Sequence, residues 1–228
     1  MIIAIDGPSG AGKSTLGKML AKKLGLLYLD TGAMYRAVAF AVLEKGESCS
    51  DPVKASDIAR DSQIELTGEP ESLQIILNGV DISTEIRSKE IAQAASVVST
   101  NSEVRKILVK HQQELGKYGG GVLEGRDIGT VVFPDADVKF FLTARPEERA
   151  QRRYKEDLER GGTISYEQTL DEINQRDKRD VSREDSPLSI AEGAVVIDTS
   201  GMTLEEILEL MLLKVEERKR APNQAAQS

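Results

Sequence analysis

The chain has 228 residues, a net charge of −8 at pH 7 and 39% hydrophobic residues, a composition typical of a folded globular protein. This acidic balance disfavours nucleic acids and anionic membranes as partners, and the longest apolar run, Ala37 to Leu43, is too short to span a bilayer. Cys49 is the only cysteine and His111 the only histidine, which excludes an intrachain disulfide and disfavours histidine-based metal sites and catalytic triads. We therefore expect a cytoplasmic protein.

The first 46 residues predict the start of a doubly wound α/β sheet. "IIAID" (2–6) is a short apolar run typical of a buried parallel strand, and a helix is expected from Lys13 to its stop at Gly25. "LLYLD" (26–30) predicts a second strand, and a second helix is expected over 33–45. Strand, loop, helix and strand in this order favour a parallel sheet with helices on its faces.

An acidic segment at about 57–99 has a different pattern and predicts a small insertion. Asn78-Gly79 lies between two β-prone runs, which is a hairpin signal, and "IEL" (64–66) can add a third strand. Thr100 and Glu103 have the spacing of a capping box that opens a helix toward position 118.

The remaining chain returns to the α/β pattern. Strands are expected at 122–124, 138–142 and 194–198, with a short lid at about 146–165. Ser165 and Gln168 are expected to cap the helix that follows the lid, and Thr203 and Glu206 the last helix. The expected core covers about 1–56, 100–145 and 166–220, and 221–228 is expected to be a disordered tail. Because no apolar stripe is left over outside the core helices, we expect a monomer.

The stretch "GPSGAGKST" (7–15) fits the pattern G-x-x-x-x-G-K-[ST]. Glycines let backbone N–H groups surround a phosphate at a helix N-terminus, Lys13 can bridge the β- and γ-phosphates, and the Ser14 hydroxyl can ligate Mg²⁺. The alternative is an ordinary glycine-rich turn, but a buried strand before the motif and a helix after it are the context that the motif requires. The expected ATP-binding residues are Gly7, Pro8, Ser9, Gly10, Ala11, Gly12, Lys13, Ser14 and Thr15.

Nucleotide binding is compatible with a kinase and with a nucleotide-operated switch or motor. A GTPase switch would require an N-K-x-D motif, which the sequence lacks, and "VLEGRD" only weakly resembles the acidic strand end of a motor ATPase. A small-molecule kinase is favoured by "DTGAMYR" (30–36), which combines a hydroxyl, an aromatic ring and a cation at a strand's carboxyl end.

Two further clusters are candidate substrate contacts. "EGRDIG" (124–129) places Arg126 next to Asp127 in a loop, whereas "QRDKRDVSRED" (175–185) is rich in arginine and aspartate. The alternative interpretation of the second cluster is a solvated charged helix end, and the alternative for Tyr35 and Arg36 is an exposed first turn of a helix.

Taken together, "IDGPSGAGKST", "DTGAMYR", "GRDIGTVVFPDA" and "RDKRDVSRED" resemble the bacterial cytidylate kinases, a family of P-loop nucleoside monophosphate kinases, over nearly the whole chain. The resemblance implies an α/β fold with a five-stranded parallel P-loop kinase core, a hairpin-containing insertion that helps to bind CMP, and a short arginine-bearing lid. It also implies transfer of the γ-phosphoryl group of ATP to CMP or dCMP in pyrimidine nucleotide metabolism.

The resemblance further implies a role for each matching residue. Arg36, Arg126 and Arg183 would bind the CMP phosphate, Thr31 and Tyr35 would line the pocket, Ser96, Arg105 and Asp127 would approach the base, Arg176 and Asp180 would reach the sugar, and Arg149, Arg152 and Arg153 would lie over the ATP phosphates. Catalytic roles would fall on Lys13, Arg126, Arg152 and Arg183, with Ser14 as the metal ligand.

The chemistry is consistent with this set, because a monophosphate oxygen is mostly anionic at neutral pH and needs no general base. Two classes of alternative remain open from the sequence. One is a P-loop kinase of another metabolite, such as UMP, shikimate or gluconate. The other is a nucleotide-binding regulator without catalytic activity.

Overall fold

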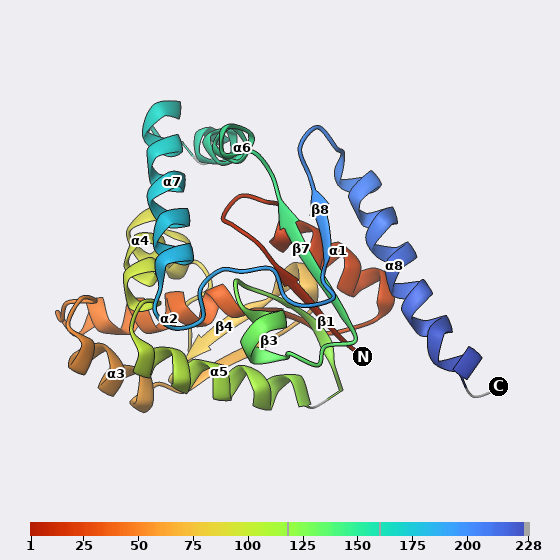
Figure 1. Ribbon diagram of the computed structural model, residues 1–228. Coiled ribbons are helices and arrows are strands. Elements are labelled where there is room, and N and C mark those ends of the chain that lie inside the picture. The colour runs from red at the N-terminus through yellow and green to blue at the C-terminus, as the bar shows by residue number, and fades with distance from the viewer. Residues whose placement is uncertain (118, 160, 226–228) are drawn as a thin grey trace.

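The computed structural model describes residues 1–117, 119–159 and 161–225, with the backbone alone described for 221–225. Five parallel strands form a central sheet in the order β2-β6-β1-β7-β8 (Figure 1). They are β1 (Ile2–Asp6), β2 (Tyr28–Asp30), β6 (Gly121–Glu124), β7 (Val138–Thr143) and β8 (Val195–Asp198). The predicted five-stranded parallel sheet is therefore confirmed.

The alternation of side chains along β1 explains how the two faces of the sheet are covered. Ile3 and Ile5 point to one face, where they are buried among the apolar side chains of α1 (Lys13–Leu24) and α8 (Leu204–Ala225). Ala4 points to the other face, toward the short helical turn η3 (Ile128–Val132) and α5 (Ser102–Lys117). Burial of each large aliphatic side chain stabilises the fold by about 1.5–3 kcal/mol.

The insertion contains a three-stranded antiparallel sheet made of β3 (Ile64–Thr67), β4 (Gln74–Leu77) and β5 (Val80–Asp81). Asn78 and Gly79 have φ angles of 51° and 81°, the left-handed conformation that a tight two-residue hairpin turn requires. The predicted hairpin and third strand are thus confirmed. Around this sheet lie α3 (Pro52–Asp61), η1 (Pro70–Ser72), η2 (Glu85–Arg87) and α4 (Lys89–Val98).

The insertion packs on α2 (Thr31–Glu44), and α4 lies along this helix. Both helices contribute to one apolar cluster that includes Val38, Val42 and Ile91. Helices α6 (Pro146–Glu159) and α7 (Tyr166–Ser182) form a helical pair above the sheet, and α7 lies above α4 of the insertion (Figure 1). The predicted capping box of Ser165 and Gln168 opens α7.

Two details of the helix ends differ from the sequence-based expectation. The side chain of Asn101, not that of Thr100, accepts the backbone N–H groups of Glu103 and Val104 at the start of α5, at 3.0 and 3.3 Å. The Thr100 hydroxyl instead donates to the Val97 carbonyl at the end of α4. Asparagine and threonine are both good caps, so the residue adjacent to the helix takes the position.

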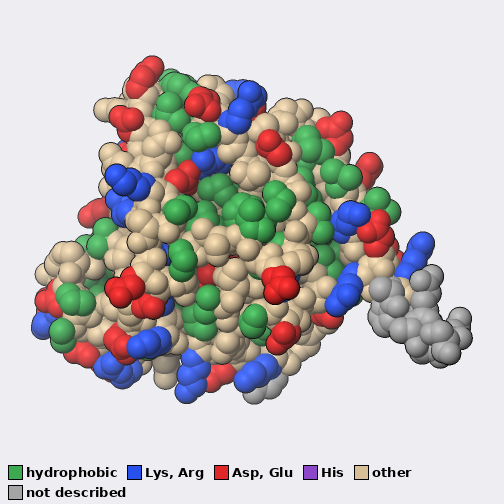
Figure 2. Space-filling view, in the orientation of Figure 1, with side chains coloured by type: hydrophobic (Ala, Val, Ile, Leu, Met, Phe, Trp, Pro, Cys, Tyr) green, Lys and Arg blue, Asp and Glu red, His purple; other side chains and the backbone are tan. Residues whose placement is uncertain are grey.

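The C-terminal end also differs. Helix α8 continues to Ala225, although a disordered tail was expected from position 221, and residues 226–228 lie outside the described part of the chain. Among the described residues, no helix is both long enough and apolar enough to cross a membrane. Acidic and basic side chains are interspersed over the face shown in Figure 2.

Candidate active site

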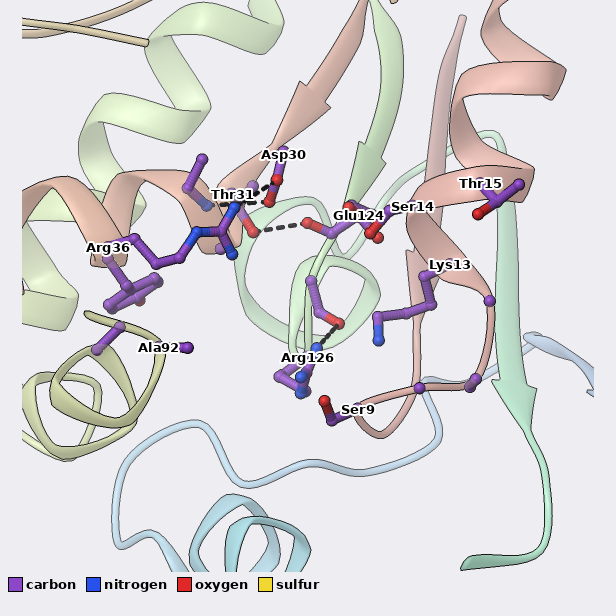
Figure 3. A pocket seen from close by; sticks show the side chains of 18 of the residues that line it. Ser9, Lys13, Ser14, Thr15, Asp30, Thr31, Arg36, Ala92, Glu124 and Arg126 are labelled. Carbon is purple, nitrogen blue, oxygen red and sulfur yellow. Dashed lines mark hydrogen bonds and ion pairs between the residues drawn. The ribbon is translucent and has the colours of Figure 1, made fainter. Parts of the chain in front are cut away.

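The candidate site lies at the carboxyl edge of the parallel sheet. Strands β1, β2 and β6 end at Asp6, Asp30 and Glu124, and their parallel registers bring the following loops to one edge. These loops and the α6–α7 pair surround a cavity of about 680 Å³, part of which is seen in Figure 3. Open α/β sheets bind ligands in this position.

The P-loop follows β1 in a backbone conformation that requires glycine at several positions, Gly7 and Gly12 among them. Gly7 has a φ of 145°, and a Cβ there would lie 2.0 Å from the Leu142 carbonyl oxygen. Gly12 is the N-cap residue of α1, has a φ of 87°, and has no side chain that could cap the helix. The first backbone N–H groups of α1 are thus available to an anion.

Most of the predicted ATP-binding residues line the cavity. They are Ser9, Gly10, Ala11, Gly12, Lys13, Ser14 and Thr15. Gly7 and Pro8 are not cavity-lining and act on the loop itself, Gly7 through its contact with β7 and Pro8 through its carbonyl, which accepts a hydrogen bond from Lys13 Nζ at 2.8 Å.

Two cations in the cavity wall have pKa values well below their usual ranges. Burial, and then repulsion from Arg126, lowers the pKa of Lys13 to about 7. The same two causes lower the pKa of Arg176 to about 10, and its buried Nε has no hydrogen-bond partner among the described residues. Buried cations that repel one another in this way would be stabilised by a bound polyanion.

A third group of charges links the loop after β6 to α7. Arg126 Nε donates to Asp180 Oδ2 at 2.8 Å, and Arg183 lies 3.9 Å from the other oxygen of the same carboxylate. Burial would raise the pKa of Asp180, but Arg126 and Arg176 hold it below its usual range. The "GRD" loop and the charged end of α7, predicted separately from the sequence, therefore meet at one carboxylate, so the solvated-helix-end alternative is wrong.

Asp127 has a different partner from Arg126. Its carboxylate accepts a hydrogen bond from Arg105 of α5, and the two residues are only 5% and 3% exposed. The Arg105 guanidinium lies over the Tyr35 ring, 5.4 Å from its centroid, a cation–π geometry. Asp127, Arg105 and Tyr35 all line the cavity.

The start of α2 lies across the cavity from the P-loop (Figure 3). Asp30 caps α2 by accepting the Ala33 N–H at 2.9 Å and pairs with Arg36 at 2.7 Å. The Thr31 hydroxyl donates to the Glu124 carbonyl at 2.7 Å, which ties α2 to β6. Tyr35 is buried and Arg36 is partly exposed, so the alternative of an exposed first helical turn is wrong for Tyr35.

Glu124 is a site residue that the sequence analysis did not select. Its carboxylate accepts the Tyr28 hydroxyl at 2.5 Å, lies beside Ser14 in Figure 3, and has a pKa raised by burial and then by Asp30. The sequence contained a signal for Glu124, because "VLE" (122–124) ends a predicted buried strand with an acidic residue. Ser14 and Glu124 offer oxygen ligands, the type that Mg²⁺ prefers. A cluster of three or more His, Cys, Asp or Glu that could hold a metal ion by itself is absent from the described ranges.

The three lid arginines differ in their surroundings. Arg152 and Arg153 line the cavity, and Arg152 donates to the Thr199 carbonyl at 2.7 Å. Arg149, expected over the ATP phosphates, is only 3% exposed and does not line the cavity. It donates to the Ser9 carbonyl at 3.0 Å and to Asp177 at 2.6 Å, so it supports the backbone of the P-loop from behind.

Ser96 is likewise removed from the cavity wall. It is 4% exposed, and its hydroxyl accepts a hydrogen bond from Arg179 Nε at 3.1 Å. This contact joins α4 of the insertion to α7. The resemblance implied that Ser96 would approach the base, whereas its hydroxyl contacts Arg179 and does not line the cavity.

A P-loop at the end of the first strand of a five-stranded parallel sheet, facing a cavity lined by buried arginines, defines a P-loop kinase of a small anionic molecule. A gluconokinase from Sinorhizobium meliloti shares this fold with a TM-score of 0.52 at 15% identity, over 100% of this chain and 97% of that one.

Sequence comparison identifies the family. Residues 3–217 match the family model described as Cytidylate kinase. The chain is 53% identical to a cytidylate kinase of Caldanaerobacter subterraneus over 91% of each chain, and 49% identical to one of Geobacter sp. (strain M21) over 96% of this chain and 94% of that one. The chain belongs to the cytidylate kinase family and is an ATP-dependent kinase.

Proposed function

We propose that the cavity binds ATP on the P-loop and CMP or dCMP against the facing arginines, and that the enzyme transfers the γ-phosphoryl group to give CDP or dCDP. The observation that carries this assignment is the set of cations from three separate elements around one cavity: Lys13 of α1, which is buried, and Arg126 after β6 and Arg176 of α7, which are half-buried. Two phosphate-bearing substrates would supply the anions that these cations face.

The phosphate of CMP is assigned to Arg36, Arg126 and Arg183. Arg126 and Arg183 share Asp180, and Arg36 is held by Asp30, so each guanidinium is positioned by a carboxylate before substrate binds. Planar guanidinium groups bind phosphate oxygens in pairs, which fixes both the position and the orientation of the acceptor. Arg176 and Asp180 are assigned to the sugar.

Transfer requires alignment rather than proton removal. An oxygen of the CMP phosphate forms a bond to the γ-phosphorus of ATP while the bond from that phosphorus to the β-phosphate oxygen breaks, and ADP leaves. The attacking oxygen is mostly anionic at neutral pH, since its second pKa is about 6, so no general base is needed. Lys13 and the arginines neutralise the charge that the two anions bring together, with Arg152 assigned to the ATP side.

Ser14 would supply a hydroxyl ligand to Mg²⁺, and the neighbouring Glu124 carboxylate would supply oxygen acceptors beside it. A bound magnesium ion would neutralise charge on the ATP phosphates. The hydrogen bond from Tyr28 holds the Glu124 carboxylate in place for this role.

The base is assigned to the pocket formed by Tyr35, Arg105 and Asp127. A carboxylate can accept from the N4 amino group of cytosine, as Asp and Glu do for cytosine in DNA, and an arginine can donate to N3 and O2. The ion pair between Asp127 and Arg105 presents an acceptor next to donors, the pattern that matches cytosine and not uracil.

A coupled ADP-release assay over CMP, dCMP, UMP, AMP and shikimate tests this proposal. We expect CMP and dCMP to be phosphorylated far faster than the other three. Faster release with shikimate would contradict a phosphate acceptor, and equal release with UMP would contradict the assignment of the base. We further expect a cytoplasmic monomer, for which light scattering of the purified protein at several concentrations tests the monomeric state.

A further inference from the structure

Asp6 is a buried carboxylate that the reaction described above does not use. It is the last residue of β1, directly before Gly7 of the P-loop, and it is 3% exposed. Its side chain does not line the cavity. One oxygen accepts the Ile128 N–H at 2.8 Å, and the other accepts the Gly129 N–H at 2.7 Å.

These two N–H groups belong to the first turn of η3, where a helical segment leaves its donors unpaired. The residue that precedes the turn, Asp127, makes no capping bond with its side chain. Asp6 of β1 therefore caps this turn from a distant part of the chain. A carboxylate accepts more strongly than a neutral oxygen, because both hydrogen bonds involve its negative charge.

This cap also holds the loop at 125–129, which contains the proposed substrate-binding residues Arg126 and Asp127. The pairing of β1 with β6 ends at Ile5 and Glu124, followed by one bond from Gly125 N to the Ile5 carbonyl. Asp6 fixes the chain again at 128 and 129. Arg126 and Asp127, the two substrate-facing residues, thus lie between two anchor points that both belong to the strand leading into the P-loop.

We propose that Asp6 is a positioning residue for the CMP-binding loop, which it fixes relative to the P-loop so that the acceptor phosphate and the ATP phosphates are held in line. Its role rests on the proposed function of the cavity. A displacement of about 1 Å in a reacting group can reduce turnover about 100-fold, so two hydrogen bonds at this point are sufficient to affect catalysis.

The electrostatic surroundings of Asp6 agree with a functional reason for its presence. Burial raises its pKa to about 6, the bonds from Gly129 and Ile128 oppose that shift, Asp127 adds to it and Lys13 opposes it. Lys139, whose stem lies beside Gly129, directs its amine to the Glu192 carbonyl. With a pKa of about 6, Asp6 is ionised at pH 8, the form that accepts both N–H groups, and it becomes protonated as the pH falls below 6.

The test compares Asp6→Asn with the wild type. Asn offers one acceptor and turns an amide donor toward a backbone N–H, so we expect kcat/KM for CMP at pH 8 to fall by about 10- to 100-fold, with a smaller change in KM for ATP. Asp137→Asn is the matched control, because Asp137 accepts the Ile2 N–H at the other end of β1 at 2.7 Å.

The pH dependence separates positioning from a general loss of structure. CMP ionises in the same way in both assays, so its ionisation does not affect the ratio of wild-type to variant kcat/KM. Protonation of Asp6 in the wild type should reduce this ratio about tenfold between pH 8 and pH 5 for Asp6→Asn, since the group is about 90% protonated one unit below its pKa. The ratio for Asp137→Asn should stay constant. A pH-independent ratio for Asp6→Asn, or an unchanged kcat/KM, would overturn the proposal.

A second variant distinguishes positioning from the charge that Asp6 places near Lys13, and it serves if Asp6→Asn does not fold. In Gly129→Ala the new Cβ would lie 3.1 Å from Ala191 Cβ, 3.3 Å from Lys139 Cδ and 3.4 Å from Asp6 Oδ2, so the loop or these neighbours must move by a few tenths of an ångström while the charge remains. We expect a raised KM for CMP with KM for ATP nearly unchanged, and a KM for CMP within about twofold of the wild type would contradict the positioning role. A wild type that fails to phosphorylate CMP would instead contradict the proposed function.

Discussion

Replacement of Asp127 by Asn tests how the enzyme distinguishes cytosine from uracil. The substitution keeps the shape of the side chain but removes the charge that pairs with Arg105, and both residues are almost fully buried. A hydrogen bond to a charged group contributes about 1.5–3 kcal/mol, which corresponds to roughly a 10- to 150-fold loss of kcat/KM for CMP. UMP, which presents an acceptor where CMP presents its amino group, should lose far less.

The assay is ADP release with CMP and with UMP, measured side by side with thermal unfolding of the ligand-free protein. Loss of a partner in a buried ion pair destabilises a fold by about 3–5 kcal/mol when the remaining charge is left alone, and less when Asn retains one acceptor. A lower melting temperature with a reduced CMP:UMP ratio is therefore the expected result. If the ratio stays at its wild-type value while both activities fall, Asp127 only holds Arg105 in place, and the assignment of base recognition is refuted.

Three further predictions concern other parts of the site. Lys13→Met should lower kcat by about 10²–10³-fold in the ADP-release assay. It should also raise the melting temperature of the ligand-free protein at pH 7. Folding lowers the pKa of Lys13 from 10.5 to about 7, so the unfolded state holds the proton more tightly. The free energy of unfolding of the wild type should therefore rise with pH between these two values, and the excess stability of the variant should shrink. An advantage that grows over that range would contradict burial of the charged amine. Hydrogen exchange in the α6 segment should slow when a bisubstrate analogue binds, and unchanged exchange would contradict a closing lid. Neutralising Glu69 and Glu71 together should leave KM for ATP unaltered, because Glu71 pairs with the exposed Lys22. A large change in that KM would show that the insertion contacts ATP.

The sequence was sufficient where local rules determine structure. The glycines and Lys13 of the P-loop, the hairpin at Asn78-Gly79 and the capping box at Ser165 each depend on residues close together in the chain, and the structure contains all three. The five strands were also predicted, since short apolar runs bounded by glycine or acids are typical of parallel sheets.

Contacts between segments that are distant in the chain were harder to predict from the sequence. Arg149 is one turn from Arg152 and Arg153 and equally charged, but only the packing of α6 against the P-loop shows that it is buried behind Ser9. The resemblance placed Arg105 and Asp127 together at the base, whereas local sequence rules could not have paired them, because they lie 22 residues apart in the chain. Asp6 and Glu124 resembled ordinary strand ends, because their hydrogen-bond partners, Ile128 and Tyr28, lie 122 and 96 residues away in the chain.

The most direct test of phosphoryl transfer between the two nucleotides uses ATP labelled at the γ-phosphate. The purified enzyme is incubated with labelled ATP, Mg²⁺ and CMP, and the products are separated by ion exchange, with Lys13→Met as the control. We predict that the label appears in the β-phosphate of CDP in amounts equal to the ADP formed, and that the control forms little of either. Label that appears as inorganic phosphate, or ADP formation that does not depend on CMP, would contradict the account.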